Sequence, residues 1–242
     1  MKTFNKAVLS LAAAFALTAL LPAARAFSAE VMAGVVVFVQ GDVKVKRAGA
    51  ADFAELKLND SLQEGDAVKT GPGAKASLVT KGGAEIRINE NTDFNIPVKK
   101  RNFFNLAAGQ VWSRMLSKMA KLNVRTPSAV CAVRGTEADI EQKEITTVKV
   151  YEGHVDLTGN SGKTQALKAG QLSTVGAGGA AAAPRQMTPS EMGKWQEGVD
   201  VKDLGKYLQQ LGLEPADNKR LKMKITGKDG KSKDVEVKLK KK

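Results

Sequence analysis

The sequence predicts a mainly β protein, in which a solenoid-like or sandwich-like domain of short strands is followed by a small α+β C-terminal extension. Three observations predict this class. Apolar residues alternate with polar ones through most of residues 31–175, a short pattern centred on glycine recurs there, and helical periodicity is almost absent from that range. We place the β-domain at 27–175 and the extension at 188–242, with a Gly/Ala-rich linker at 176–187 between them.

The recurring pattern is an apolar residue, two further residues, glycine, one residue and another apolar residue. Its strong copies are centred on Gly41, Gly109 and Gly153. Alternation on both sides of one glycine predicts a strand, a tight turn or bulge, and a second strand. Repetition of such units favours a solenoid or a sandwich in which each unit covers the next.

Two further segments fit the same fold. Residues 75–80 and 84–90 flank the pair Gly82-Gly83, which predicts a hairpin. Residues 122–126 alternate in polarity up to Pro127, where a turn should begin.

The C-terminal extension begins with helical signals. Residues 188–191 form a capping box with proline at the first helical position, and they predict a short helix that ends near Gly198. We expect Asp200 to cap a second helix and Gly212 to end it. The apolar face of this second helix would be Leu204, Tyr207, Leu208 and Leu211.

Residues 1–26 have the pattern of a signal peptide: a short basic start, an apolar run broken by Pro22, and Ala24-Arg25-Ala26 as the cleavage signal. The alternative is a retained membrane anchor, for which the apolar run is short. Cleavage would lower the net charge from +13 to +10 and predicts an exported protein, periplasmic or extracellular. With Cys131 as the only cysteine, an intramolecular disulfide is excluded.

The segment VRTPSAVCAVRGTEADIE, residues 124–141, combines a Thr126-Pro127 turn, a run of small residues, Arg134-Gly135-Thr136 and an alternating strand. It resembles the core motif of the FecR domain family. Collinear segments at 67–94 and 148–171 resemble a hairpin region and the closing strand pair of that family. Two positions depart from the family pattern: Cys131 replaces a smaller residue, and Ala138 replaces a common aromatic, which implies a locally thinner core.

The resemblance implies an extracytoplasmic, β-rich, solenoid-like domain that senses or binds and is not an enzyme. Well-known members of the family are transmembrane regulators of sigma factors in iron uptake, with a cytoplasmic segment that holds the sigma factor. Only six residues precede the apolar run of this chain, so we expect the extracytoplasmic domain without a sigma-binding segment.

Two groups of residues have the composition of a chemical site. Cys131 and His154, the only cysteine and histidine, are a candidate nucleophile and base. The apolar stretch around Cys131 favours a small buried side chain instead, and we expect His154 to be exposed. The second group is acidic: one strand face would carry Glu137, Asp139 and Glu141, which are candidate ligands of a hard cation. A solvated strand face is the favoured interpretation, so we predict no metal, no cofactor and no small-molecule substrate.

We expect the motif residues to be structural. Gly135 would permit a turn, and Thr136 would bond to the local backbone. Arg134, if partly buried, needs a carboxylate such as Glu137 or Glu152 and would then lock neighbouring strands together; a ligand contact is the alternative. The full set of predicted structural residues is Thr126, Pro127, Arg134, Gly135, Thr136 and Glu137.

Residues 219–242 contain eleven Lys or Arg and three Asp or Glu, a net charge of +8. Residues 221–226 and 235–240 alternate on either side of a turn and predict an amphipathic hairpin with a lysine face. Such a face attracts an anionic envelope polymer or membrane surface; the alternative is a solvated edge that lysines protect from aggregation. Nucleic acid is disfavoured because aromatic side chains are lacking here. The candidate binding residues are Lys222, Lys224, Lys238, Lys240, Lys241 and Lys242.

Together these patterns predict a non-enzymatic, exported binding or sensing module of the cell envelope. Its partner would be an envelope protein or an anionic envelope component. The alternative is an accessory component of transmembrane signalling that does not contact a sigma factor directly.

Overall fold

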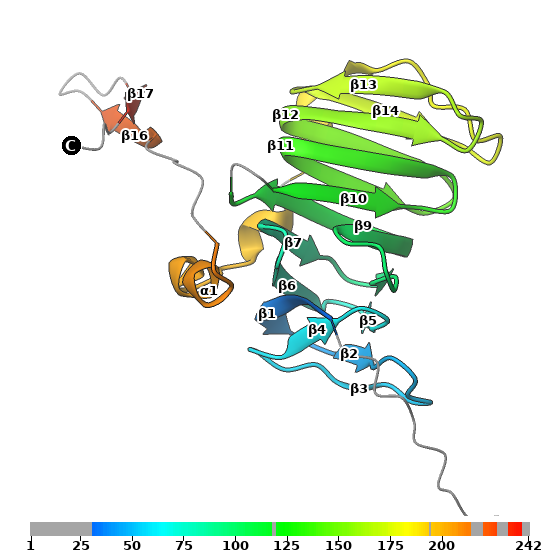
Figure 1. Ribbon diagram of the computed structural model, residues 1–242. Coiled ribbons are helices and arrows are strands. Elements are labelled where there is room, and N and C mark those ends of the chain that lie inside the picture. Colours follow the sequence, from blue (N-terminus) through cyan, green and yellow to red (C-terminus); the bar gives the residue numbers. More distant parts are fainter. Residues whose placement is uncertain (1–30, 118–119, 194, 214–219, 227–231, 239–242) are drawn as a thin grey trace, which may run out of the picture. The chain divides into compact units, whose positions relative to one another are not determined.

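The computed structural model describes residues 31–117, 120–193 and 195–213, and gives the backbone alone for 220–226 and 232–238. Within these ranges the protein is mainly β, as predicted, and fifteen of the described strands belong to one sheet (Figure 1). They are β1 (Met32–Gln40), β2 (Val43–Lys46), β3 (Ala54–Glu55), β4 (Ser61–Gln63), β5 (Ala67–Thr70), β6 (Lys75–Thr80), β7 (Ala84–Ile88), β8 (Asp93–Asn95), β9 (Phe103–Met115), β10 (Lys121–Arg125), β11 (Ala129–Gln142), β12 (Thr146–Gly159), β13 (Thr164–Lys168), β14 (Gln171–Val175) and β15 (Arg185–Gln186).

The sheet is open and has two layers, because its three longest strands each pair with different neighbours along their two halves. In β9, residues 103–108 pair with β8 and β10, whereas residues 109–115 pair with β7 and β11. In β12, the half before Gly153 pairs with β14 and the half after it pairs with β13. Apolar residues of both halves belong to one buried core cluster, so the two layers face each other across it.

We call the two sides the open layer and the covered layer. The open layer consists of β2, β3, β5, β8, β10, β13 and residues 103–108, 129–134 and 154–158 of the long strands. The covered layer consists of β1, β4, β6, β7, β14, β15 and residues 109–115, 137–142 and 146–152.

The corners between the layers lie at the glycines of the recurring sequence pattern. Gly153 has a φ of +73°, and a Cβ atom there would lie 2.6 Å from the carbonyl oxygen of Gly135, so only glycine fits. The Thr136 hydroxyl lies within hydrogen-bonding distance of the carbonyl oxygens of Arg134 and His154, and it accepts the His154 N–H. The predicted backbone role of Thr136 is confirmed by these contacts, which hold β11 to β12 at the corner.

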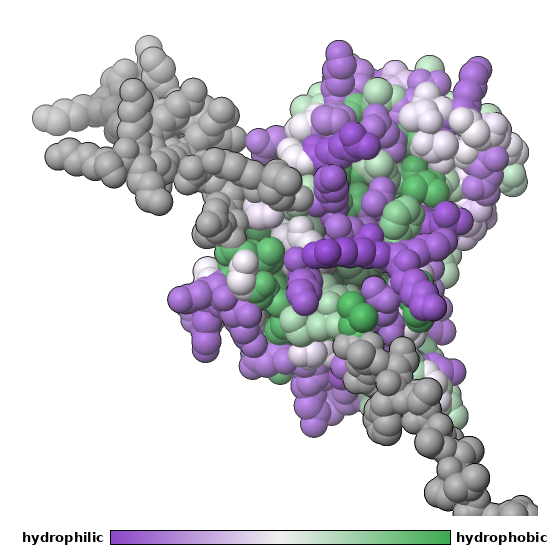
Figure 2. All heavy atoms as spheres, in the orientation of Figure 1, coloured by the Kyte–Doolittle hydropathy of each residue, from purple (hydrophilic) through white to green (hydrophobic). Residues whose placement is uncertain are grey.

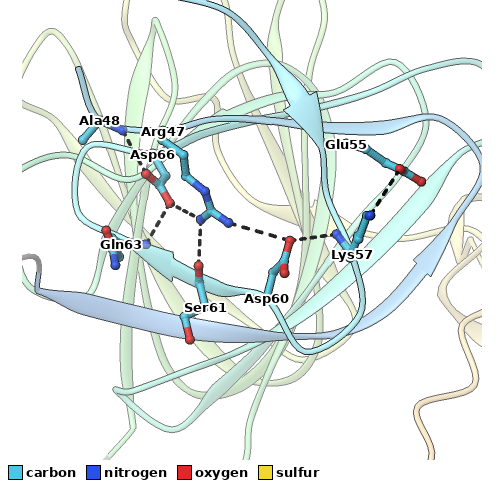
Figure 3. A network of polar contacts seen from close by, with 8 residues as sticks. All are labelled: Arg47, Ala48, Glu55, Lys57, Asp60, Ser61, Gln63 and Asp66. Atoms are coloured by element: carbon cyan, nitrogen blue, oxygen red, sulfur yellow. Dashed lines mark hydrogen bonds and ion pairs between the residues drawn. The ribbon is translucent and has the colours of Figure 1, made fainter. Parts of the chain in front are cut away.

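The first units of the sheet are tied together by a network around one buried carboxylate. Asp66 is fully buried and accepts hydrogen bonds from the Arg47 guanidinium at 2.8 Å and from the backbone N–H groups of Ala48 and Gln63 (Figure 3). Arg47 also donates to the carbonyl oxygen of Ser61. The network closes the loops beside β2 and β4. The predicted hairpin is confirmed as β6 and β7, which pair antiparallel.

Residues 176–187, expected to be a linker, are instead a structured edge of the sheet. Val175 forms a bridge with Ala181, and β15 pairs with β14. The N–H of Ser161 donates to the carbonyl oxygen of Gly179, which ties this edge to the turn after β12.

The C-terminal helices are shorter than the sequence indicates. The capping box of Thr188 and Glu191 is present, but the first helix is two 3-10 segments, η1 (Pro189–Glu191) and η2 (Trp195–Gly198). The next helix, α1 (Leu204–Gln210), has Asp203 at its N-cap, so the assignment of Asp200 as the cap is wrong. Gly212 follows its C-terminus with a φ of +67°, as expected.

The apolar face of α1 packs on the covered layer. Leu208 joins Val37, Val79 and Leu116 in a second apolar cluster. The partly buried residues that pack against this cluster are Val201, Leu204, Tyr207, Leu211 and Leu213. None of the helices in the described part of the chain has the length and apolar character needed to cross a membrane.

The predicted basic hairpin is present as β16 (Arg220–Thr226) and β17 (Ser232–Lys238), which pair antiparallel with Lys222 opposite Glu236. The side chains of this hairpin lie outside the described residues, as do the signal-peptide prediction at 1–26 and Lys240, Lys241 and Lys242.

Candidate functional site

The strands of the open layer bring four basic residues into one row. Lys121 of β10 lies opposite Arg134 of β11, Arg134 lies opposite His154 of β12, and His154 lies opposite Lys168 of β13. Figure 1 shows these strands stacked one beside the next. Residues directly opposite one another in a sheet project from the same face. We call Lys121, Arg134, His154 and Lys168 the basic row.

The basic row is exposed and carries no ion pair within the described ranges. All four residues are exposed, and none forms a salt bridge with a carboxylate of the described ranges. Like charges placed directly opposite each other destabilise a sheet, so this arrangement does not serve the fold. It leaves three cations and one imidazole available to a partner.

A shallow trough lies beside the row. Its volume is about 330 Å³, and its lining includes Lys121, Asn123, Ala132, Arg134 and Gly135. Nothing lies within 4 Å of where a Cβ atom of Gly135 would stand, so the space above this corner is open. Figure 2 shows hydrophilic residues running across the middle of the visible face, with a few apolar residues exposed among them.

The outer face of the covered layer has a different character, with alternating charges and a tryptophan. The Glu85 carboxylate is fully buried and pairs with Arg87 at 2.7 Å and with Arg114 at 2.6 Å. Both guanidinium groups lie over the ring of Trp112, at 4.6 Å and 5.7 Å from its centre. Trp112 itself donates through Nε1 to Glu137 at 3.0 Å. Every charged group in this cluster therefore has a partner.

Residues 187–213, which we call the C-terminal strap, cover this cluster. Trp195 donates through Nε1 to the Asp139 carboxylate at 2.8 Å, and Arg87 donates to the carbonyl oxygen of Gln196. Lys75 donates to the carbonyl oxygen of Trp195 at 3.3 Å. The strap thus shields the outer face of the covered layer and leaves the open layer accessible.

The three acidic residues expected on a solvated strand face are covered to different degrees. Asp139 is 1% exposed and accepts hydrogen bonds from Trp195 and Gln110, while Glu137 and Glu141 are partly buried. Burial raises the pKa of Asp139 from 3.8 to about 6, and the hydrogen bonds from Trp195 and Gln110 oppose that shift. The prediction failed because the covering strap comes from a distant part of the chain.

Only one sequence signal could have indicated this cluster. The chain has two tryptophans, and large aromatic side chains on an outward strand position are usually covered by another element. Alternation places Trp112 outward, and Trp195 lies in the predicted extension, so the two could have been paired.

Cys131 and His154 are on opposite faces of the open layer. Cys131 is fully buried in the core, and burial raises the pKa of its thiol from 9.0 to about 12. His154 is exposed on the outer face, opposite Arg134. The predicted packing position of Cys131 and the predicted exposure of His154 are both confirmed. A pair divided by the sheet has no route for proton transfer between its members.

The motif residues divide into structural and exposed groups. Thr126 is buried and bonds with Thr146 at 2.7 Å and with the backbone of Ala129, and the carbonyl oxygen of Pro127 accepts a bond from Asn160. These contacts fix the turn before β11.

Arg134 does not have the structural role that was expected for it. It is exposed and has no carboxylate partner among the described residues. Of the two partners expected for it, Glu137 bonds to Trp112 instead and Glu152 is exposed. The bulge at Gly135 places Arg134 in the open layer and Glu137 in the covered layer. The prediction that Arg134 locks neighbouring strands together is therefore wrong. Within the described ranges, no three His, Cys, Asp or Glu side chains lie close enough to hold a metal ion.

Two solved structures are similar to part of this chain. They are crystal structures of a candidate anti-sigma factor from Parabacteroides distasonis, at 1.65 Å and 2.50 Å resolution. Each is 16% identical with a TM-score of 0.46, and each match covers 55% of this chain. The matches cover 65% and 64% of those chains, a little under two thirds. No curated protein matches this chain.

Residues 66–156 match the family model described as FecR protein. The matched range contains the corner motif, three of the four residues of the basic row, and both partners of the Trp112–Glu137 hydrogen bond. Over residues 66–156, this match confirms the FecR resemblance that the VRGT segment indicated.

Proposed function

We propose that this chain is a non-enzymatic binding module of the cell envelope that acts in signalling, and that it recognises its partner with the outer face of the open layer. The observation that carries this proposal is the basic row: four in-register basic residues, exposed and without ion pairs in the described ranges. An arrangement that weakens the sheet is best explained by a partner that neutralises it.

A binding role is supported further by the chemistry of the polar groups. The buried acids Asp66, Glu85 and Asp139 all have hydrogen-bond donors from the surrounding structure. The thiol of Cys131 is shielded in the core. A converging nucleophile, base and oxyanion donor set is the feature that would favour catalysis, and these residues do not form one.

The proposals on location and signalling rest on the domain and on the N-terminal sequence. The resemblance to the sigma regulators of the FecR family implies an extracytoplasmic domain, and residues 1–26 have the pattern of a signal peptide. We place the protein in the periplasm or outside the cell. The role in signalling is supported by the FecR domain. The lysine-rich residues 219–242 would add attraction to an anionic surface.

The test compares three full-length baits in cell-envelope extracts, at low and at high salt. The baits are the wild type, Arg134→Glu in the basic row and, as a matched control, Lys206→Glu on α1, which is also exposed. We expect the wild type and Lys206→Glu to retain the same envelope component and Arg134→Glu to lose it. Equal retention by all three baits would contradict the proposal.

A fourth bait lacking 232–242 measures the contribution of the basic hairpin. We expect weaker retention of anionic material that is restored in part by lowering the salt concentration. Retention of the partner by this bait, combined with its loss in Arg134→Glu, would place recognition in the FecR domain.

A further inference from the structure

We propose that the ligand of the open layer is an acidic glycan, a chain of carboxylate-bearing sugars that lies across β10 to β13. This inference rests on the proposed function, because it names the ligand class for the same face. Three features of the face carry it: the line of the cations, the acid and amide beside that line, and an aromatic ring at its edge.

The line of cations fits a chain molecule better than a single small anion. Neighbouring strands of a sheet are about 4.8 Å apart, so the four residues of the basic row extend over roughly 15 Å. They point from the same face of four adjacent strands, with Arg134 and His154 in the middle. A compact anion could touch two of them, whereas a polymer with repeated negative groups could touch all four.

The composition of the next row on the same face does not suit a ligand that carries only negative charge. It consists of Asn123, Ala132, Asp156 and Ala166, which lie opposite one another across the same strands. The Asp156 carboxylate would repel a chain that carries negative charge alone, but it accepts hydrogen bonds from hydroxyl groups. Asn123 can donate and accept. Sugars bring both hydroxyl and carboxylate groups, so an acidic glycan satisfies both rows.

The floor and the edge of the face suit sugar rings. Ala132 and Ala166 are small, and the trough of about 330 Å³ lies over Ala132. Phe103 of β9 pairs in parallel register with Asn123 and is half-buried, so its ring offers an apolar surface at the edge of the row. Farther along the strands, the hydroxyl groups of Thr158 and Thr164 lie 2.9 Å apart and extend the polar surface.

The acid near the row limits what else can bind. Asp156 lies opposite Ala132, in the row next to the basic row, so the face is not uniformly positive. A membrane surface would present negative charge over the whole area, including the position of Asp156. A linear glycan can place its carboxylates on the row alone, and its hydroxyl groups elsewhere.

His154 makes the test site-specific, because it is the chain's only histidine and lies in the row. The imidazole signals of the full-length protein are followed by NMR during titration with an oligogalacturonate long enough to span roughly 15 Å. Neutral maltodextrin, monomeric galacturonic acid and inorganic polyphosphate serve as comparison ligands. We expect a saturable shift of the His154 signals with the oligogalacturonate, and a much weaker response to the other three.

Substitutions test which side chains contact the oligogalacturonate. Arg134→Glu should weaken oligogalacturonate binding about tenfold, a loss of about 1.4 kcal/mol, and Lys206→Glu should leave it unchanged. Asp156→Ala should lower the ratio of oligogalacturonate affinity to polyphosphate affinity. Circular dichroism of each variant confirms that its fold is retained.

Two results would overturn the inference. Polyphosphate that binds as tightly as the oligogalacturonate would show that charge alone attracts ligands to this face. If envelope material still requires Arg134 but no acidic glycan shifts His154, the binding face stands and the glycan assignment is wrong. A failure of the proposed function differs from both, because Arg134→Glu would then retain its envelope partner.

Discussion

Single residues in this protein show how the surrounding structure supplies partners to buried charged and polar groups. Glu85 lies between two guanidinium groups, and Thr136 shares its hydroxyl among three backbone groups at a corner. Arg134, two residues from Thr136, is exposed and has none of these partners. Neighbours in the sequence therefore differ in their contribution to stability.

The first prediction separates Arg134 from Thr136. Arg134→Ala should change the free energy of unfolding by less than about 0.5 kcal/mol, as is usual for an exposed residue. Thr136→Val should lower it by about 1–3 kcal/mol, because the buried Thr136 hydroxyl is removed and the partly buried His154 N–H loses its acceptor. Urea unfolding of both variants measures this difference. A loss in Arg134→Ala as large as that in Thr136→Val would restore the locking role for Arg134.

The second prediction concerns the pH dependence produced by Asp139. Its pKa is raised from 3.8 to about 6, so the folded protein binds this proton more tightly than the unfolded chain does. The contribution of this group to stability therefore decreases as the pH rises from 3.8 to about 6. Asp139→Asn should lack this dependence. The unfolding free energy of the wild type minus that of Asp139→Asn should decrease as the pH rises across that range; a constant or increasing difference would contradict the assignment.

At the level of elements, the strap is attached in two chemically different ways. The helix α1 buries Leu208 against Val37 and Val79. Exposing this apolar contact to water would cost free energy, so it holds α1 on the sheet. The η2 segment is attached through Trp195 and through hydrogen bonds of its backbone to Arg87 and Lys75. Loss of the Trp195 contact removes a hydrogen bond and the cover of a buried carboxylate at once.

The third prediction concerns the attachment of the strap through Trp195. Trp195→Ala should leave the FecR domain folded but make the strap sensitive to protease, because Asp139 loses a donor and the segment loses a partly buried indole ring. Limited proteolysis followed by mass spectrometry identifies the cleavage sites. Met192→Ala is the control, since the Met192 side chain is 45% exposed and should leave the pattern unchanged. Equal protease resistance of wild type and Trp195→Ala would contradict the prediction.

At the level of the whole domain, one core cluster is shared by most strands of the sheet. It extends from Val43 of β2 through Phe94 and Cys131 to Leu167 of β13, with contributions from both layers. Because the strands share this core, and because long strands pass from one layer to the other, partial separation of the layers would break the backbone pairing of both. The described domain should therefore unfold as one unit.

The fourth prediction uses two probes in this domain. Cys131 is the only thiol and is fully buried, so a thiol reagent reaches it only when the core opens. In Trp195→Phe, fluorescence reports on Trp112 alone, at the outer face of the covered layer. We expect both probes to change at the same denaturant concentration. Labelling of Cys131 at a lower concentration would show that the open layer separates first.

Local sequence patterns determined the strands, their corners and the resemblance to the FecR family that residues 66–156 carry. Period-two alternation fixed which residues of β11 and β12 face the core, since side chains of a strand alternate, and this placed Cys131 inside and His154 outside. The glycine pattern located the corners because only glycine accepts the close approach at Gly153. The VRGT segment identified the FecR domain.

Contacts between distant parts of the chain decided the two surfaces. Which strand lies beside which is set by pairing over long sequence distances, so the alignment of Lys121, Arg134, His154 and Lys168 could not be obtained from any local period. The burial of Asp139 likewise depends on Trp195, 56 residues away. The sequence by itself determined the class of fold and the position of its turns, because those depend on neighbouring residues. Tertiary structure decided which polar residues are covered and which form a binding face, because their surroundings come from other strands and from the strap.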